Sequence, residues 1–136
     1  MKILNFGSLN VDYVYSVDYF VRAEETLKVN SREVLPGGKG LNQSVVLARA
    51  GADVCHAGCI GADGEFLRTL LNENGVDTSL LRTIGGMQGH TIIQVDSRGE
   101  NCILLYGGTN RRISDSQIDE TLARFGPGDW RHCRNH

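Results

Sequence analysis

The sequence predicts an α/β fold that combines a parallel sheet with a second, smaller sheet. Apolar strand patterns alternate along the first half of the chain with helical patterns, and this alternation predicts the parallel sheet. Residues 91–106 then show two strand patterns joined by a loop that contains glycine. That pattern predicts a β-hairpin in a separate sheet, which could cover a site built at the main one.

The first predicted strand spans residues 2–9 and ends in a turn. Asn10 and Asp12 come directly after it. Ligands of open α/β sheets gather beyond the carboxyl ends of the strands, so these two side chains are candidates for hydrogen bonds to a ligand. The alternative at both positions is an ordinary turn with local side-chain hydrogen bonds.

The following segments continue the alternation. Residues 25–35 mix β-formers with polar residues, which predicts a half-exposed strand. Residues 44–50 predict a helix that ends near Gly51. Residues 54–61 predict a second buried strand, and residues 63–74 an amphipathic helix.

The last predicted helix opens with a capping box. Ser114 is placed to cap the helix, with Gln117 three residues later, and one face of the helix carries Ile118, Leu122 and Phe125. A strand is due after this helix in an α/β order. Residues 131–136 instead turn basic, with Cys133 as their only apolar residue, and we expect no regular strand there.

The glycine-rich segment at residues 36–43 is the most informative part of the chain. Gly37 and Gly38 allow the backbone to turn sharply and to approach a ligand closely. Lys39 and Asn42 follow, and a helix begins at this point. Backbone N–H groups at a helix N-terminus suit a polar or anionic ligand, so the segment is interpreted as a binding loop.

Two nucleotide-binding motifs fit this segment poorly. A P-loop needs glycine five residues before Gly38, where the chain has Glu33, and the dinucleotide fingerprint needs glycine where the chain has Gln43. An ordinary glycine turn before a helix, with Lys39 in solvent, remains the alternative.

Composition excludes several classes of protein. The chain has 136 residues, which suits one domain or part of one, and its net charge of -2 argues against a nucleic-acid-binding surface. It has neither an apolar run long enough for a membrane nor a signal peptide at its N-terminus, so we expect a cytoplasmic protein. The four cysteines lack zinc-site spacing and predict buried, reduced thiols, with no metal site.

Several motifs together resemble the ribokinase-like (PfkB) family of carbohydrate kinases, and within it the ribokinases most closely. They occur in the family's order over residues 3–130, at 7–12, 37–43, 51–54, 58–63 and 107–110. The resemblance implies a Rossmann-like αβα sandwich with a small β-sheet lid, whose strands lie near residues 13–35 and 90–106. It also implies that the lid helps to form a homodimer.

The resemblance further implies a sugar-binding site, with ribose as the expected sugar. By position, Asn10 and Asp12 would bind sugar hydroxyls, as would Gly38, Lys39 and Asn42. The chemistry agrees, because carboxylate and amide groups suit vicinal hydroxyls and Lys39 adds a charge-assisted hydrogen bond. Gly37 and Gly38 would form the hinge on which the lid closes.

The resemblance also implies ATP, Mg²⁺ and a monovalent cation, which the family binds mainly through its C-terminal half. That half carries the catalytic aspartate in a Gly-Ala-Gly-Asp-type motif, and this motif is absent here. We therefore assign no catalytic residue, treat residues 1–130 as the N-terminal part of the family's domain and residues 131–136 as an aberrant tail. The expected function is the sugar-binding and lid portion of a sugar kinase. The alternative is an inactive, truncated or frameshifted fragment that at most binds sugar or dimerises.

Overall fold

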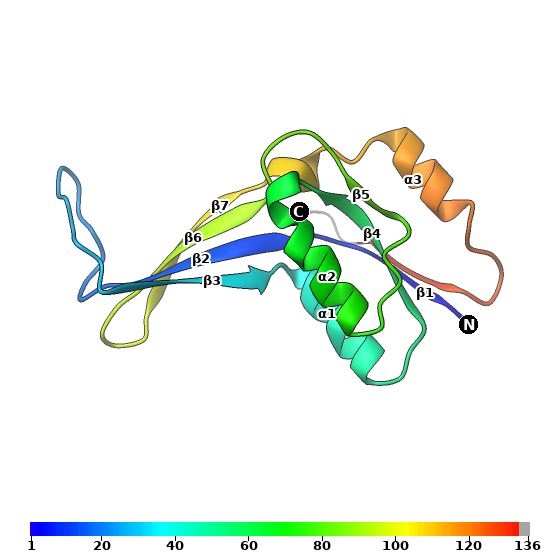
Figure 1. Ribbon diagram of the computed structural model, residues 1–136, viewed down its shortest axis with the longest axis horizontal. Helices are drawn as coiled ribbons and strands as arrows, with labels where there is room; N and C mark the ends of the chain where they lie inside the picture. Colours follow the sequence, from blue (N-terminus) through cyan, green and yellow to red (C-terminus); the bar gives the residue numbers. More distant parts are fainter. Residues whose placement is uncertain (134–136) are drawn as a thin grey trace.

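A computed structural model describes residues 1–133, which form two four-stranded sheets (Figure 1). The main sheet is parallel, in the order β5 (Leu81–Thr83), β4 (Val54–Ile60), β1 (Ile3–Phe6) and β8 (Trp130–Cys133). The second sheet has the order β3 (Ser31–Gly37), β2 (Asn10–Ser16), β6 (His90–Val95) and β7 (Asn101–Tyr106). It projects away from the helices, and we call it the lid sheet. The predicted α/β class, with a parallel sheet and a second sheet, is confirmed.

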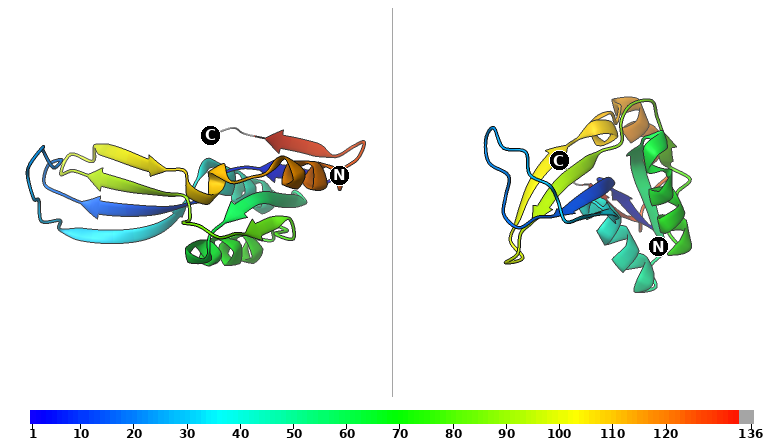
Figure 2. Two further views of the ribbon diagram at one scale, coloured as in Figure 1. Left: turned by 90° about the horizontal axis from the view of Figure 1, so that it is seen from above. Right: turned by 60° about the vertical axis from the view of Figure 1, so that its left-hand side comes forward.

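Helices cover both faces of the main sheet (Figure 2). On one face, α1 (Lys39–Arg49) and α2 (Glu65–Glu73) contribute to a core that includes Ile60 of β4. On the other, α3 (Asp115–Leu122) packs against Leu4 of β1. Both cores form because successive residues of a strand point to opposite faces, and all seven residues of β4 are buried. Short 3₁₀ turns, η1 (Ala62–Gly64) and η2 (Gly108–Arg111), precede α2 and follow β7.

The structure differs from the sequence prediction in three strands. The opening strand predicted over residues 2–9 forms only as β1, and β2 begins at Asn10, so Asn10 and Asp12 lie in a lid strand rather than in a turn. The strand predicted over residues 25–35 forms only from Ser31, as β3.

The third difference lies at the end of the described chain. Trp130–Cys133 forms β8 and pairs in parallel with β1, where the basic sequence predicted no strand. Backbone hydrogen bonds to β1 hold this edge strand, whose four residues are all exposed. Of the predicted aberrant tail, residues 134–136 lie outside the described residues.

The predicted cap of α3 forms only in part. Ser114 accepts a hydrogen bond from the backbone N–H of Gln117 at 3.1 Å, as a capping residue should. The Gln117 side chain does not complete the box, because it donates to the carbonyl of Gly58 and accepts from the thiol of Cys59. It therefore ties α3 to β4 instead of to its own N-terminus.

Two of the four cysteines depart from the expected burial. Cys55 and Cys59 are buried, and burial raises the pKa of the Cys55 thiol to about 11. Cys102 and Cys133 are exposed, and all four are reduced. No helix within residues 1–133 is both long enough and apolar enough to cross a membrane.

Candidate functional site

The candidate site lies where the main sheet meets the lid sheet. Residues 7–9 connect β1 directly to β2, so both sheets are anchored to one short segment. Gly7 touches Gly40 of α1 so closely that a Cβ on Gly40 would lie 2.5 Å from the carbonyl carbon of Gly7. Only glycines permit this approach, and it brings the N-terminus of α1 against the junction.

Two amide side chains hold the junction on its other side. Asn110 accepts a hydrogen bond from the Leu9 N–H and donates to the Leu9 carbonyl, both at 3.0 Å. Gln88 is almost fully buried and donates to the same carbonyl at 2.6 Å, while its oxygen accepts from the Gly61 N–H. The segments before β6 and after β7 are thereby attached to the β1–β2 connection.

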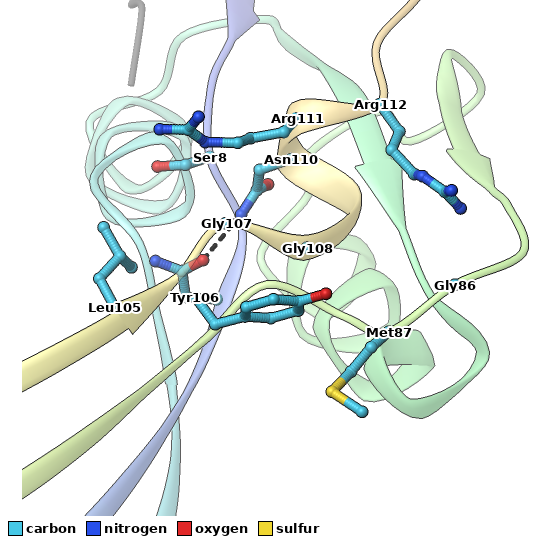
Figure 3. A pocket seen from close by; sticks show the side chains of 11 residues that line it. Ser8, Gly86, Met87, Leu105, Tyr106, Gly107, Gly108, Asn110, Arg111 and Arg112 are labelled. Carbon is cyan, nitrogen blue, oxygen red and sulfur yellow. Dashed lines mark hydrogen bonds between the residues drawn. The ribbon is translucent and has the colours of Figure 1, made fainter.

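A pocket of about 710 Å³ opens beside this junction (Figure 3). Its lining comes from three segments that are far apart in sequence. They are the β1–β2 connection with the start of β2, the segment before β6, and the end of β7 with η2: Ser8, Asn10, Gly86, Met87, Leu105, Tyr106, Gly107, Gly108, Asn110, Arg111 and Arg112. Its size suits a small-molecule ligand.

Asn10 lines the pocket and is held in one orientation. Asn110 must present its nitrogen to Asn10, because its oxygen already accepts from the Leu9 N–H. This nitrogen donates to the side-chain oxygen of Asn10 at 2.7 Å. The Asn10 amide nitrogen forms no hydrogen bond to other residues in the described part of the chain, which leaves it as a donor for a ligand.

Asp12 lies two residues further along β2, on the same face of the strand. One carboxylate oxygen accepts a 2.7 Å hydrogen bond from the hydroxyl of Thr91 on β6. The other lies over Gly37, where a Cβ would come within 2.2 Å of it. Position 37 therefore has to be glycine on steric grounds. Gly37 contacts Asp12, which is one of the residues predicted to bind the sugar.

The remaining predicted residues lie at the start of α1. Gly38 has φ +98°, and a Cβ there would lie 2.7 Å from the carbonyl oxygen of Ser8. It therefore needs to be glycine on both conformational and steric grounds. Lys39 is the first residue of α1 and is exposed, and its ammonium forms no hydrogen bond or ion pair with the described residues.

Asn42 is not in the pocket that Asn10 lines. It is exposed and lines a second cavity, of about 630 Å³, between α1 and β8. Trp130 and Arg131 lie on the β8 side of that cavity. The structure thus groups Asp12 with Gly37 and Gly38 with Ser8, and separates Asn42 from Asn10.

A buried polar network supports the junction from below. The carbonyl of Gly7 can only accept, so His56 donates to it through Nε2 at 3.0 Å and accepts from the Ser44 hydroxyl through Nδ1 at 2.7 Å. Ser44 in turn accepts from Asn5 at 2.9 Å. Burial lowers the pKa of His56 to about 4, so the imidazole is neutral at pH 7.

Asp63 and Asp129 each follow an alanine or a glycine, but neither lies in a Gly-Ala-Gly-Asp motif. Asp129 precedes β8, at the edge of the main sheet opposite the junction, and accepts hydrogen bonds from the N–H groups of Lys2 and Gly126. These bonds lower its pKa. Asp63 accepts from the N–H of Gln88 at 3.1 Å and helps to hold the segment before β6.

Sequence reasoning missed several residues of the pocket. Tyr106 and Arg111 carried no expected role, and Ser8 and Asn110 stood only within the motifs at residues 7–12 and 107–110. Adjacent glycines directly after a predicted strand were the available signal, because Gly107 and Gly108 mark a turn at a strand end, where sites form. Gln88 carried no such signal, and its role depends on the tertiary contact with Leu9.

Comparison with known proteins identifies relatives. The family described as pfkB family carbohydrate kinase matches residues 1–133. A curated ribokinase of Haemophilus influenzae is 37% identical over 126 residues, which cover 90% of this chain and 41% of the relative.

Solved structures give the same result. The ribokinase of Thermotoga maritima matches with a TM-score of 0.81 and 31% identity, and covers 90% of this chain. The ribokinase of Arabidopsis thaliana, solved with ribose and ATP, matches with a TM-score of 0.75 and 26% identity over 87% of this chain. The chain spans 41% of each of these two structures, which is less than half of their length.

Proposed function

Because the chain belongs to the pfkB family of carbohydrate kinases, we propose that it forms the sugar-binding and lid portion of an ATP-dependent kinase that phosphorylates ribose or a related sugar. The observation that carries this proposal is the pairing of Asn10 and Asp12 on one face of β2, beside a pocket at the junction of the two sheets. The relatives named above are ribokinases, and one of them was solved with ribose and ATP.

The side chains at the junction suit a ligand with several hydroxyl groups. Asn10 has an amide N–H to donate, and Asp12 has a carboxylate to accept from vicinal hydroxyls. Thr91 and Asn110 fix the orientation of these two side chains, so little side-chain entropy would be lost on binding. Gly38 and Lys39, at the start of α1, are proposed to bind the same sugar, and Gly37 with Gly38 to act as the hinge of the lid. Asn42, which was also expected to bind the sugar, lines the cavity beside β8 and is left out of this proposal.

The phosphoryl donor is proposed to be ATP, bound together with Mg²⁺. ATP supplies the phosphoryl group that is transferred. No group of three or more His, Cys, Asp or Glu side chains within residues 1–133 is arranged to hold a metal ion. The described residues therefore offer no cluster of that kind for Mg²⁺. The proposal accordingly assigns the sugar to this chain and does not assign a site for the metal ions.

Titration of the chain with ribose, followed by calorimetry, tests the sugar site. Asp12→Asn removes the negative charge while keeping the shape, and loss of a charged hydrogen bond should weaken binding by about tenfold. Asp119→Asn is the matched control, because Asp119 is an exposed aspartate on α3, away from the junction. Equal affinities for ribose in the chain and the Asp12→Asn variant would contradict the proposal.

A second candidate function is sugar binding without catalysis. It is favoured by the side chains at the junction, where Asn10 offers a donor and Asp12 an acceptor to hydroxyl groups. Because phosphoryl transfer depends on positioned charges around the phosphate, we expect no turnover from this chain alone. ATP-dependent formation of ribose phosphate by the purified chain would exclude this candidate.

We also propose that the lid sheet mediates a homodimer in the cytoplasm. The support is the exposure of apolar side chains on the face of the lid sheet opposite Asp12, where Leu104 is 70%, Val34 44% and Ile92 40% exposed. Apolar surface of this kind is typical of interaction sites.

A further inference from the structure

One end of the pocket carries two consecutive arginines. Arg111 and Arg112 are among its eleven lining residues, and none of the eleven is acidic. The lining of the pocket therefore carries two positive charges and no negative one, a distribution that favours an anionic ligand.

Arg111 is directed into the pocket by its own backbone segment (Figure 3). Its side chain extends from η2 toward Ser8 on the β1–β2 connection. It packs against Gly107, where an added Cβ would meet its Cγ and Cδ at 2.8 Å. The absence of a side chain at Gly107 thus leaves room for the arginine to lie along the turn.

Arg112 points in the opposite direction, toward Gly86. Its guanidinium donates to the carbonyl of Gly85 at 3.1 Å, which holds the segment before β6. The two arginines therefore have different roles: Arg112 bonds to the protein, and Arg111 faces the pocket.

No protein anion neutralises Arg111 within residues 1–133. The two ion pairs there join other arginines, Arg68 and Arg82, to glutamates. The Arg111 guanidinium also forms no hydrogen bond to the described residues, so its planar set of donors is available to a ligand.

We propose that this end of the pocket is an anion subsite, in which Arg111 binds the phosphate group of a small-molecule ligand. A guanidinium binds phosphate through two parallel hydrogen bonds, and the Ser8 hydroxyl on the same side of the pocket can add a third. The inference deepens the proposed function, because Asn10 would bind a hydroxyl group of the same ligand. The phosphate belongs either to a sugar that is already phosphorylated or to a nucleotide.

Calorimetric titrations with inorganic phosphate, ribose 5-phosphate and ATP test the subsite. We expect at least one of these ligands to bind, and Arg111→Gln to weaken that binding by about tenfold through loss of a charged hydrogen-bond pair. Arg111→Lys should weaken binding less than Arg111→Gln does, because lysine keeps the positive charge but lacks the paired donors of the guanidinium. Arg124→Gln is the matched control, because Arg124 is exposed near the end of α3 and outside the pocket.

Each outcome is informative. Arg111-dependent binding of ribose 5-phosphate supports an anionic sugar, and Arg111-dependent binding of ATP alone supports a nucleotide phosphate. Binding that is unaffected by Arg111→Gln, or equally weakened by Arg124→Gln, would overturn the proposal. Neutral ribose, titrated with the Asp12→Asn variant, tests the sugar site separately, so failure of the anion subsite leaves the proposed function standing.

Discussion

The Asp12 carboxylate lies where it does because its diagonal neighbour on β3, Gly37, has no side chain. Any Cβ on Gly37 would occupy the same space as a carboxylate oxygen, at 2.2 Å. Thr91 holds the other oxygen from β6. Three strands of the lid sheet therefore fix one functional group, and the glycine is as necessary as the residues that donate hydrogen bonds.

Gly37→Ala should displace this carboxylate. We expect overpacking to lower the free energy of unfolding by about 1–3 kcal/mol and to weaken ribose binding as Asp12→Asn does. Gly126→Ala is the matched control, because a Cβ at Gly126 meets no atom within 4 Å and its φ lies outside the left-handed region. Urea denaturation and ribose titration of both variants check this, and unchanged binding in Gly37→Ala would contradict it.

His56 should make stability depend on pH. Its pKa is about 4 in the folded chain and about 6.5 when unfolded, so the unfolded state binds more protons between these values. The free energy of unfolding should therefore fall as pH decreases from 6.5 to 4, by roughly 3 kcal/mol from this group. Urea denaturation at several pH values measures this decrease in the free energy of unfolding.

Two histidine variants separate this effect from other titrations. His56→Gln should flatten the pH dependence over that interval, whereas His90→Gln should leave it in place, since His90 is only half buried and lies in the lid sheet. A pH profile unchanged by His56→Gln would show that His56 does not titrate as its burial implies.

At the scale of elements, the decisive contact joins the β1–β2 connection to η2. These segments are about 100 residues apart, yet Asn110 pairs with both backbone groups of Leu9 and orients Asn10. A side-chain amide here replaces the backbone pairing that a neighbouring strand would supply. The pocket depends on this contact because two of the three segments that form its walls are the ones it joins.

Asn110→Ala should loosen the junction specifically. Loss of three hydrogen bonds at partly buried groups should cost about 1–3 kcal/mol of stability, and the Leu9 amide should exchange its hydrogen faster. Asn110→Asp keeps an acceptor for the Leu9 N–H and should restore part of that protection. Asn101→Ala, at an exposed position in β7, is the control. Equal protection of Leu9 in all variants, by hydrogen exchange, would contradict this role.

At the scale of the whole molecule, the lid sheet exposes apolar side chains on both faces. Leu105 shares the face of Asp12, because both are paired with Thr91, while the neighbouring Leu104 points to the opposite face. Leu104 is 70% exposed and Leu105 is 66% exposed. One face is thus available to cover a sugar and the other to meet a partner.

Leu104→Glu should therefore weaken self-association without weakening ribose binding. A charge at the centre of an apolar interface must be desolvated, which shifts the equilibrium toward monomer. Val46→Glu is the matched control, since Val46 is also an exposed apolar residue, 66% exposed, but lies on α1. Sedimentation at several concentrations measures the dimer, and identical behaviour of the two variants would place the interface elsewhere.

The sequence by itself determined the features that follow from local chemistry. Period-2 and helical patterns predicted β4, α2 and the β6–β7 hairpin, since the burial of apolar faces decides those elements. Glycine chemistry located the start of α1, and motif order identified the family. Position after the first strand singled out Asn10 and Asp12, and the structure places them on one face.

Tertiary contacts decided the rest. β8 forms from a basic segment because β1 offers backbone partners, and no side-chain pattern reports that. The Gln117 side chain bonds to β4 instead of completing the cap of α3. Asn42 lines a cavity with Trp130 and does not line the pocket of Asn10. The pocket itself joins three distant segments through Gln88 and Asn110. Such contacts depend on which backbone groups the fold leaves without partners, and only the assembled chain defines those groups.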